Sequence, residues 1–214
     1  MKLGVIDYGA GNLRSVLNTF EAAGVHGHLV RTPEDAEGVT HLVLPGVGAF
    51  AACMEGLKKV DGDRVIYDRI RAGRPVLGVC VGEQIMFEHG LEHGAHAAGI
   101  GLIGGSVNLL DADVVPHMGW DTIEAAPDSV LLNGVENERF YFVHSYAAME
   151  VKPADTSRFD IDLSDSPERV SWCSYGRSRF VAAYEHGPLS ATQFHPEKSG
   201  DAGSQLLKNW IATL

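Results

Sequence analysis

Short apolar runs alternate with helix-like segments along the first ninety residues, and this alternation restricts the fold more than any other feature. The β-rich runs cover residues 3–6, 41–44 and 75–79. The helix-like segments cover residues 12–23, 51–60 and 83–88. Strands that are apolar along their whole length belong to a sheet covered on both faces, as in α/β proteins. We therefore predict a doubly wound, mainly parallel α/β sheet, with its functional loops after the carboxyl ends of the strands.

The pattern changes in the second half of the chain. Between about residues 109 and 183, short extended stretches such as 140–143 are separated by Pro, Gly, Asp and Ser, which predicts antiparallel or mixed β structure. Residues 153–169 are interpreted as a loop or hairpin, and residues 201–212 as a closing helix. With 214 residues, 45% of them hydrophobic, the chain is long enough for one core, so we expect a single domain over residues 1–214.

Charge and cysteine content exclude several classes of function. A formal net charge of -11, without a cluster of Lys or Arg, predicts no nucleic-acid partner and no anionic membrane surface. The N-terminus reaches Asp7 after too few apolar residues for a signal peptide, and no later run is long enough for a bilayer. The 3 cysteines are an odd number without close pairing, which favours a reducing compartment. We expect a cytoplasmic protein.

Cys80 is the strongest candidate nucleophile. Gly78-Val79-Cys80-Val81-Gly82 follows a β-rich run and precedes a helix-like one, which is the G-x-nucleophile-x-G pattern of a sharp strand-to-helix turn. Such a turn strains the backbone of the nucleophile and needs flanking residues without bulk. A following helix N-terminus favours the thiolate. The alternative is a cysteine buried for packing, which is how we interpret Cys53 and Cys173 because neither has flanking glycines.

A base and a carboxylate stand together in Gln193-Phe194-His195-Pro196-Glu197. Pro196 restricts His195 to an extended conformation, so the side chains of His195 and Glu197 project to the same side of the chain. Glu197 can then hold one imidazole nitrogen while the other faces Cys80. A surface turn with a solvated His and Glu is the alternative if this segment is considered alone.

Backbone N–H groups near Cys80 predict an oxyanion hole. The glycine-rich turn after residue 44 lies at the same sheet edge as Cys80, and we expect Val47 and Gly48 to contribute there together with Val81. An ordinary strand-to-helix turn would also use Pro and Gly, and that interpretation stays open.

Taken together, these segments resemble the class I, triad-type glutamine amidotransferases. Within that group the chain resembles the glutaminase subunits of imidazole glycerol phosphate synthases. The blocks that carry this resemblance lie at residues 8–13, 45–50, 78–84, 116–120, 141–146 and 195–199.

The resemblance implies a reaction, a partner and roles for several residues. Cys80 would attack the side-chain amide of glutamine, His195 would protonate the departing ammonia, and Glu197 would orient the imidazole. The ammonia would pass to a (β/α)8-barrel cyclase subunit in histidine biosynthesis, and no cofactor is implied. Gly48, Gln84 and Ser145 would hold glutamine. The positions matching the subunit interface are Asn12, Trp120, Tyr141 and Lys198.

Two residues depart from the family pattern, which usually has Met at position 83 and Asn at position 121. This chain has Glu83 and Asp121, and each adds a negative charge near a functional segment. A Glu83 carboxylate close to Cys80 would disfavour the thiolate, so we expect Glu83→Met to raise glutaminase turnover near neutral pH.

Two other motifs give weaker indications of function. Residues 7–12 lack the third glycine of a dinucleotide-binding turn, because position 14 is Arg. His89, His93 and His96 lack the supporting pattern of a metal site, so we expect no metal.

Two alternative functions stay open. One is another class I glutaminase, such as the one serving pyridoxal phosphate synthesis, and the other is a catalytically silent regulatory partner. A cysteine peptidase of related fold is more remote.

Overall fold

A seven-stranded sheet forms the centre of the computed structural model, which describes residues 2–213. Its strands are arranged in the order β11-β12-β13-β4-β3-β1-β2. They are β1 (Leu3–Ile6), β2 (Gly27–Val30), β3 (His41–Gly46), β4 (Val76–Cys80), β11 (Glu168–Tyr175), β12 (Ser178–His186) and β13 (Leu189–Thr192). The five strands from β2 to β13 run parallel. At one end of the sheet, β12 pairs antiparallel with β13 and β11 pairs antiparallel with β12.

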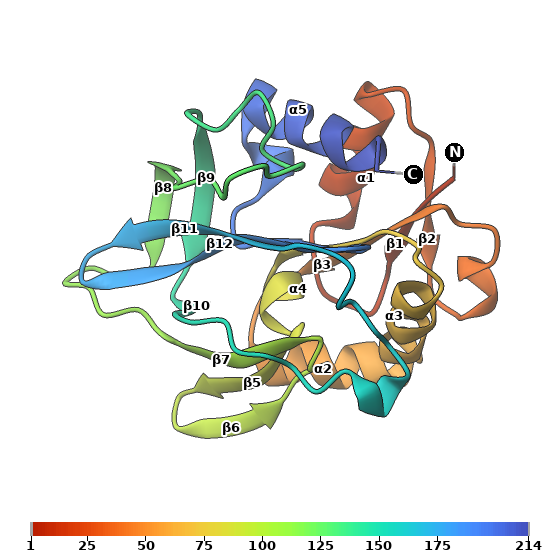
Figure 1. Cartoon of the computed structure of the whole chain (residues 1–214), viewed down its shortest axis with the longest axis horizontal. Coiled ribbons are helices and arrows are strands. Elements are labelled where there is room, and N and C mark those ends of the chain that lie inside the picture. The colour runs from red at the N-terminus through yellow and green to blue at the C-terminus, as the bar shows by residue number, and fades with distance from the viewer. Residues whose placement is uncertain (1, 214) are drawn as a thin grey trace.

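Helices cover both faces of this sheet (Figure 1). They are α1 (Leu13–Ala22), α2 (Phe50–Lys59), α3 (Gly62–Arg71), α4 (Val81–Gln84) and α5 (Gly200–Ile211). α1 and α5 lie on one face, and α2, α3 and α4 on the other. Every residue of β1, β3 and β4 is consequently buried, which explains why these strands are apolar without alternation. The predicted doubly wound, mainly parallel sheet is confirmed.

Two smaller sheets are built from the middle of the chain, between residues 87 and 148. One is four-stranded, in the order β10-β7-β5-β6, with β5 (Phe87–Glu92), β6 (Ala95–Ala98), β7 (Ile103–Leu109) and β10 (Tyr146–Ala148). The other is two-stranded and pairs β8 (His117–Thr122) with β9 (Arg139–His144) in antiparallel register. Short 3-10 helices occur at η1 (Glu34–Ala36), η2 (Ser157–Phe159) and η3 (Pro196–Lys198). The expected antiparallel and mixed β portion is therefore present.

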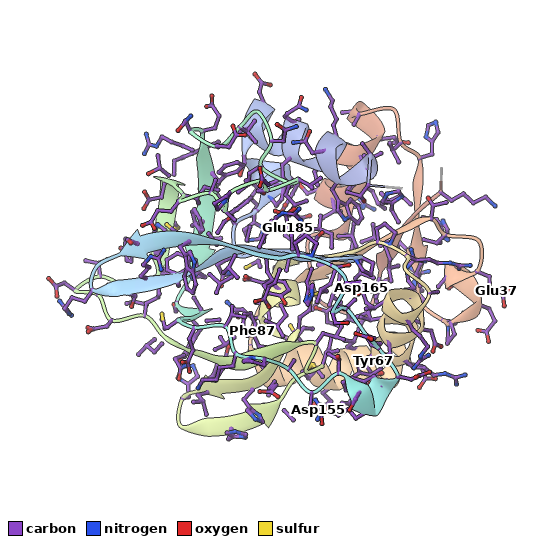
Figure 2. The ribbon with its side chains drawn as sticks, viewed as in Figure 1. Glu37, Tyr67, Phe87, Asp155, Asp165 and Glu185 are labelled. Atoms are coloured by element: carbon purple, nitrogen blue, oxygen red, sulfur yellow. The ribbon has the colours of Figure 1, made fainter. Side chains whose placement is uncertain are left out.

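Buried side chains hold these parts together. Figure 2 shows Phe87 and Glu185 inside the molecule, whereas Glu37 and Asp155 lie at its periphery. The buried Glu185 carboxylate accepts hydrogen bonds from the backbone N–H groups of Val130, at 2.9 Å, and Leu131, at 3.1 Å. An interior carboxylate needs such partners, so Glu185 anchors the turn that follows residue 128 to the sheet.

One expected helix was wrong. The helix-like segment at residues 83–88 ends after the single turn of α4, and β5 begins at Phe87. The Ile85 carbonyl accepts from Ile100 N at 2.7 Å, and the Met86 carbonyl accepts from Leu102 N at 2.9 Å. Since the next segment of chain uses these carbonyls, the helix cannot continue. The sequence analysis also missed β2 and α3, while the closing helix is confirmed as α5.

Within the described residues, no helix is long and apolar enough to cross a membrane.

Candidate active site

The nucleophile candidate stands at a strained turn. Cys80 ends β4 with φ 56° and ψ -114°, and α4 begins at the next residue. A side-chain-bearing residue rarely has such a backbone conformation, and strain of this kind concentrates at functional sites. A Cβ atom at Gly82 would overlap the Leu44 carbonyl oxygen, and one at Gly78 would lie 2.8 Å from the Gly82 carbonyl oxygen. The two glycines are therefore sterically required, as the motif predicted.

Three parallel strands bring the catalytic segments together. β4 lies between β3 and β13, with Gly46 opposite Cys80 and Thr192 opposite Val79. Parallel strands present their carboxyl ends at one sheet edge, so the loops after all three strands meet around Cys80. α4 has only one turn, so its dipole favours the thiolate less than the helix expected from the sequence would.

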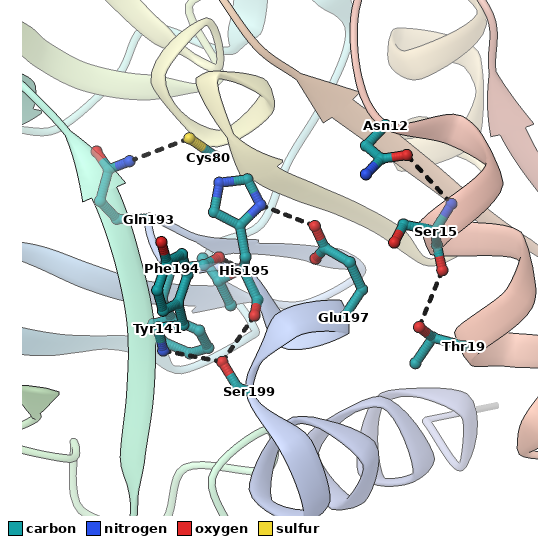
Figure 3. Close-up of polar contacts among 11 residues, drawn as sticks. Asn12, Ser15, Thr19, Cys80, Tyr141, Gln193, Phe194, His195, Glu197 and Ser199 are labelled. Atoms are coloured by element: carbon teal, nitrogen blue, oxygen red, sulfur yellow. Dashed lines mark hydrogen bonds and ion pairs between the residues drawn. The ribbon is translucent and has the colours of Figure 1, made fainter. Parts of the chain in front are cut away.

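His195 and Glu197 form a buried pair beside Cys80 (Figure 3). His195 Nδ1 lies 2.8 Å from Glu197 Oε1, and the two side chains are 6% and 5% exposed. His195 has the predicted extended backbone, fixed by a 2.9 Å hydrogen bond from its N–H to the Tyr141 carbonyl. Burial by itself lowers the pKa of His195, but hydrogen bonds with Cys80 and Glu197 outweigh it and raise the pKa to about 9. The imidazole is therefore held in its protonated form.

A pair of buried amides lies on the other side of Cys80. Gln84 Nε2 donates to the Tyr146 carbonyl at 2.7 Å and to Gln193 Oε1 at 2.8 Å. Gln193 Nε2 in turn lies 3.8 Å from Cys80 Sγ. Gln84 thus has both amide hydrogens occupied within the chain, and it also borders a cavity beside Cys80. Sequence reasoning missed Gln193; its only signal was its place in the segment that contains His195.

An open cavity of about 490 Å³ lies over the nucleophile. This volume is in the range of about 300–1,000 Å³ that is usual for small-molecule sites. Its lining includes Gly48, Cys80, Gln84, Ser145 and His195. The cavity therefore brings together Cys80, His195 and the three residues that the resemblance assigned to glutamine, while Glu197 lies behind His195 and outside the cavity lining.

The glycine-rich turn after β3 forms one wall of this cavity. Val47 and Gly48 line it together with Val81, and these are the three residues predicted to form an oxyanion hole. Gly48 has φ +93°, a conformation that favours glycine. The turn is held from α2, because Cys53 Sγ donates to the Val47 carbonyl at 3.3 Å.

Three of the four predicted interface residues lie together. The Trp120 side chain is 45% exposed, and its ring meets Tyr141 edge-on at 6.0 Å between centroids. Lys198 Nζ lies 5.8 Å from the centroid of the Tyr141 ring. Asn12 instead caps α1 and accepts a hydrogen bond from Ser15 N at 3.3 Å.

The remaining candidates do not form a site. Cys53 lies on α2 and Cys173 on β11, and burial raises the pKa of both thiols, to about 12 for Cys173. His89 and His96 lie on the antiparallel pair β5 and β6, with ring centroids 4.6 Å apart. Among residues 2–213, no group of three or more His, Cys, Asp or Glu side chains could hold a metal ion.

Comparisons with known proteins agree with this geometry. The family model for glutamine amidotransferase class-I matches residues 4–214. The imidazole glycerol phosphate synthase subunit HisH of Bifidobacterium longum is 87% identical over 98% of both chains. The corresponding protein of Leifsonia xyli is 54% identical over 98% of this chain and 97% of its own.

Solved structures share the fold at low identity. A crystal structure of a glutamine amidotransferase has a TM-score of 0.71 at 14% identity, covering 99% of this chain and 97% of the other. The structure of PurLQS from Thermotoga maritima has a TM-score of 0.67 at 15% identity, covering 98% of this chain and 97% of the matched one. With its matched length, its nucleophile turn and its buried His-Glu pair, the chain belongs to the class-I glutamine amidotransferase family.

Proposed function

We propose that this chain is the glutaminase subunit of an imidazole glycerol phosphate synthase, releasing ammonia from glutamine for histidine biosynthesis. One observation carries the chemistry: Cys80, strained at the end of β4, shares a cavity with a His195 that is hydrogen-bonded to Glu197. The relatives named above support the pathway.

In the first half-reaction, the Cys80 thiolate attacks the side-chain carbonyl carbon of glutamine. The carbonyl oxygen becomes an oxyanion, which the backbone N–H groups of Val47, Gly48 and Val81 would stabilise. Gly48, Gln84 and Ser145 would hold the substrate, as they border the cavity. His195, with a pKa raised to about 9, gives its proton to the leaving nitrogen as the C–N bond breaks, leaving a thioester and ammonia.

In the second half-reaction, water replaces the thiolate. His195, now neutral, removes a proton from the attacking water, and the C–S bond breaks to give glutamate and the free Cys80 thiolate. Glu197 holds His195 Nδ1 at 2.8 Å in both steps, which orients the opposite ring nitrogen toward the sulfur.

The partner would be a (β/α)8-barrel cyclase subunit, forming a heterodimer that also catalyses the lyase step of the synthase. Trp120, Tyr141 and Lys198 form the docking surface in this proposal, and Asn12 contributes from the start of α1. An exposed Trp with aromatic and cationic neighbours is a favourable interface anchor. We further propose that the chain forms one domain and that the enzyme is cytoplasmic. Its three cysteines are free and buried, which supports a reducing compartment.

Glutamate release from glutamine tests the proposal. The purified chain is assayed alone and with a cyclase partner plus its nucleotide ligand, beside a Cys80→Ala control. We expect strong stimulation by the liganded partner and no release by the control. Activity without stimulation would indicate another class I glutaminase, and no activity under any condition would favour a silent partner.

A further inference from the structure

Two buried histidines outside the catalytic pair lie opposite each other on β8 and β9. His117 and His144 are register partners, and His117 Nδ1 is 3.2 Å from His144 Nε2. The His117 ring also stacks on Tyr175 at 4.1 Å and on Phe142 at 4.9 Å between centroids. Buried imidazoles need polar partners, so the direction of each hydrogen bond matters.

The Tyr146 carbonyl joins this pair to the active site. It accepts from His144 Nδ1 at 3.0 Å and from Gln84 Nε2 at 2.7 Å. A carbonyl oxygen can only accept, so it fixes a hydrogen on His144 Nδ1 and the orientation of the Gln84 amide. The second N–H of Gln84 then donates to Gln193 Oε1, which leaves the Gln193 NH₂ group directed at Cys80 Sγ, 3.8 Å away.

The protonation of His144 also determines the direction of its hydrogen bond with His117. Burial lowers the pKa of His144 to about 3, so the ring is neutral, and with Nδ1 protonated its Nε2 must accept from His117 Nδ1. His117 Nε2 lies 3.3 Å from Asp121 Oδ2. Burial lowers the pKa of His117, and the Asp121 carboxylate opposes this only in part, so at neutral pH the ring keeps one hydrogen, on Nδ1, and the series of hydrogen bonds ends at His117. The Asp121 side chain is 36% exposed and follows Trp120 in β8.

A continuous series of hydrogen bonds thus connects buried His117 on β8 to the catalytic sulfur. We propose that His144, supported by His117, is a positioning residue for the nucleophile: it holds the Tyr146 carbonyl so that the Gln84–Gln193 pair directs an N–H at Cys80. This inference deepens the proposed glutaminase function, on which its relevance to turnover rests. His117 places the outer end of the series on β8, the strand proposed to meet the cyclase.

The test measures the reactivity of Cys80 without glutamine or a partner. The isolated full chain is treated with iodoacetamide between pH 5 and 10, and labelling of the Cys80 peptide is followed by mass spectrometry. In His144→Leu we expect the midpoint of the labelling profile to move upward by about one pH unit, a size suited to losing one hydrogen bond to a charged group. His144→Asn, which keeps a donor near the Nδ1 position, should restore most of the wild-type profile.

Two further variants show whether the effect passes through Gln193. In a Gln193→Met background, His144→Leu should cause no additional shift, because the final donor is already absent. His117→Phe keeps the aromatic stacking, so it should fold even if His144→Leu does not, and it should shift the profile in the same direction by less. His186→Leu removes a hydrogen-bonded histidine outside the cavity lining and should leave the profile unchanged.

The proposal is overturned by a folded His144→Leu with the wild-type profile, by equal shifts in the Leu and Asn variants, or by additive shifts in the Gln193→Met background. If His144→Leu does not fold, an unshifted His117→Phe overturns it. These results concern the positioning of Cys80 alone. Failure of the wild-type chain to release ammonia with its partner would instead overturn the proposed function.

Discussion

Glu83 should destabilise the protein, and removing it should raise the free energy of unfolding. The side chain is 2% exposed, and its Oε1 atom is buried without a hydrogen-bond partner. An unpaired buried polar group costs about 1–3 kcal/mol. We therefore expect Glu83→Met to stabilise the chain by about 1–3 kcal/mol at low pH, where the carboxyl is protonated in both the folded and the unfolded chain, or about 2–4 °C in melting temperature for each kcal/mol.

The pH dependence has a definite sign. Burial, and then the charge of Cys80, raise the pKa of Glu83 well above its ordinary value. As pH rises, the unfolded chain loses this proton first while the folded chain retains it, so stability falls between the two pKa values. The fall amounts to about 1.4 kcal/mol for each pH unit in that window. Glu83→Met should remove this contribution from the slope.

Urea unfolding at several pH values between 4 and 9 measures both effects. Glu83→Gln is the matched control, because it cannot titrate but keeps an unpaired polar group. Glu83→Gln should flatten the slope of the free energy of unfolding against pH as Glu83→Met does. At low pH, however, it should gain less stability than Glu83→Met. A Glu83→Met variant with the same slope as the wild type, or with lower stability at every pH, would show that Glu83 carries no such penalty.

This structure also refines the expected effect of Glu83 on catalysis. Because burial keeps the carboxyl protonated over a wider pH range than that of an exposed glutamate, its repulsion of the thiolate moves to higher pH. The gain in glutaminase turnover predicted for Glu83→Met should therefore grow as pH rises. An unchanged pH-rate profile would reject it.

Three other predictions follow from single contacts. Glu197→Gln removes the carboxylate that helps raise the pKa of His195, so the falling alkaline limb of kcat/KM should move to lower pH by about one unit; an unmoved limb would contradict this role. Gly82→Ala should destabilise the chain by about 1–3 kcal/mol or more in urea unfolding, because its Cβ overlaps the Leu44 carbonyl; wild-type stability would show that the turn can relax. Trp120→Ala should weaken cyclase binding by about 2 kcal/mol in titration calorimetry with the melting temperature nearly unchanged; undiminished affinity would place the interface elsewhere.

Local sequence patterns determined the central sheet and the candidate triad. The apolar strands and their alternation with helices predicted the parallel sheet, since burial on both faces leaves a continuous apolar run. The glycines around Cys80 and the proline after His195 specified backbone conformations that are set within a few residues. The cavity then contains Gly48, Cys80 and His195 because their strands are parallel neighbours.

Contacts between distant segments decided the rest. The segment at residues 83–88 has the composition of a helix, yet it leaves the helix after Gln84 and enters a strand at Phe87, because the N–H groups of residues 100 and 102 bond to the carbonyl oxygens of residues 85 and 86. Gln84 and Gln193 are 109 positions apart in sequence, and their amide pair exists only because β13 lies beside β4. The direction of a hydrogen bond depends on the partner atom at the other end. Packing between distant segments determines which atom that partner is, so a sequence pattern of a few residues cannot predict the direction of the hydrogen bond.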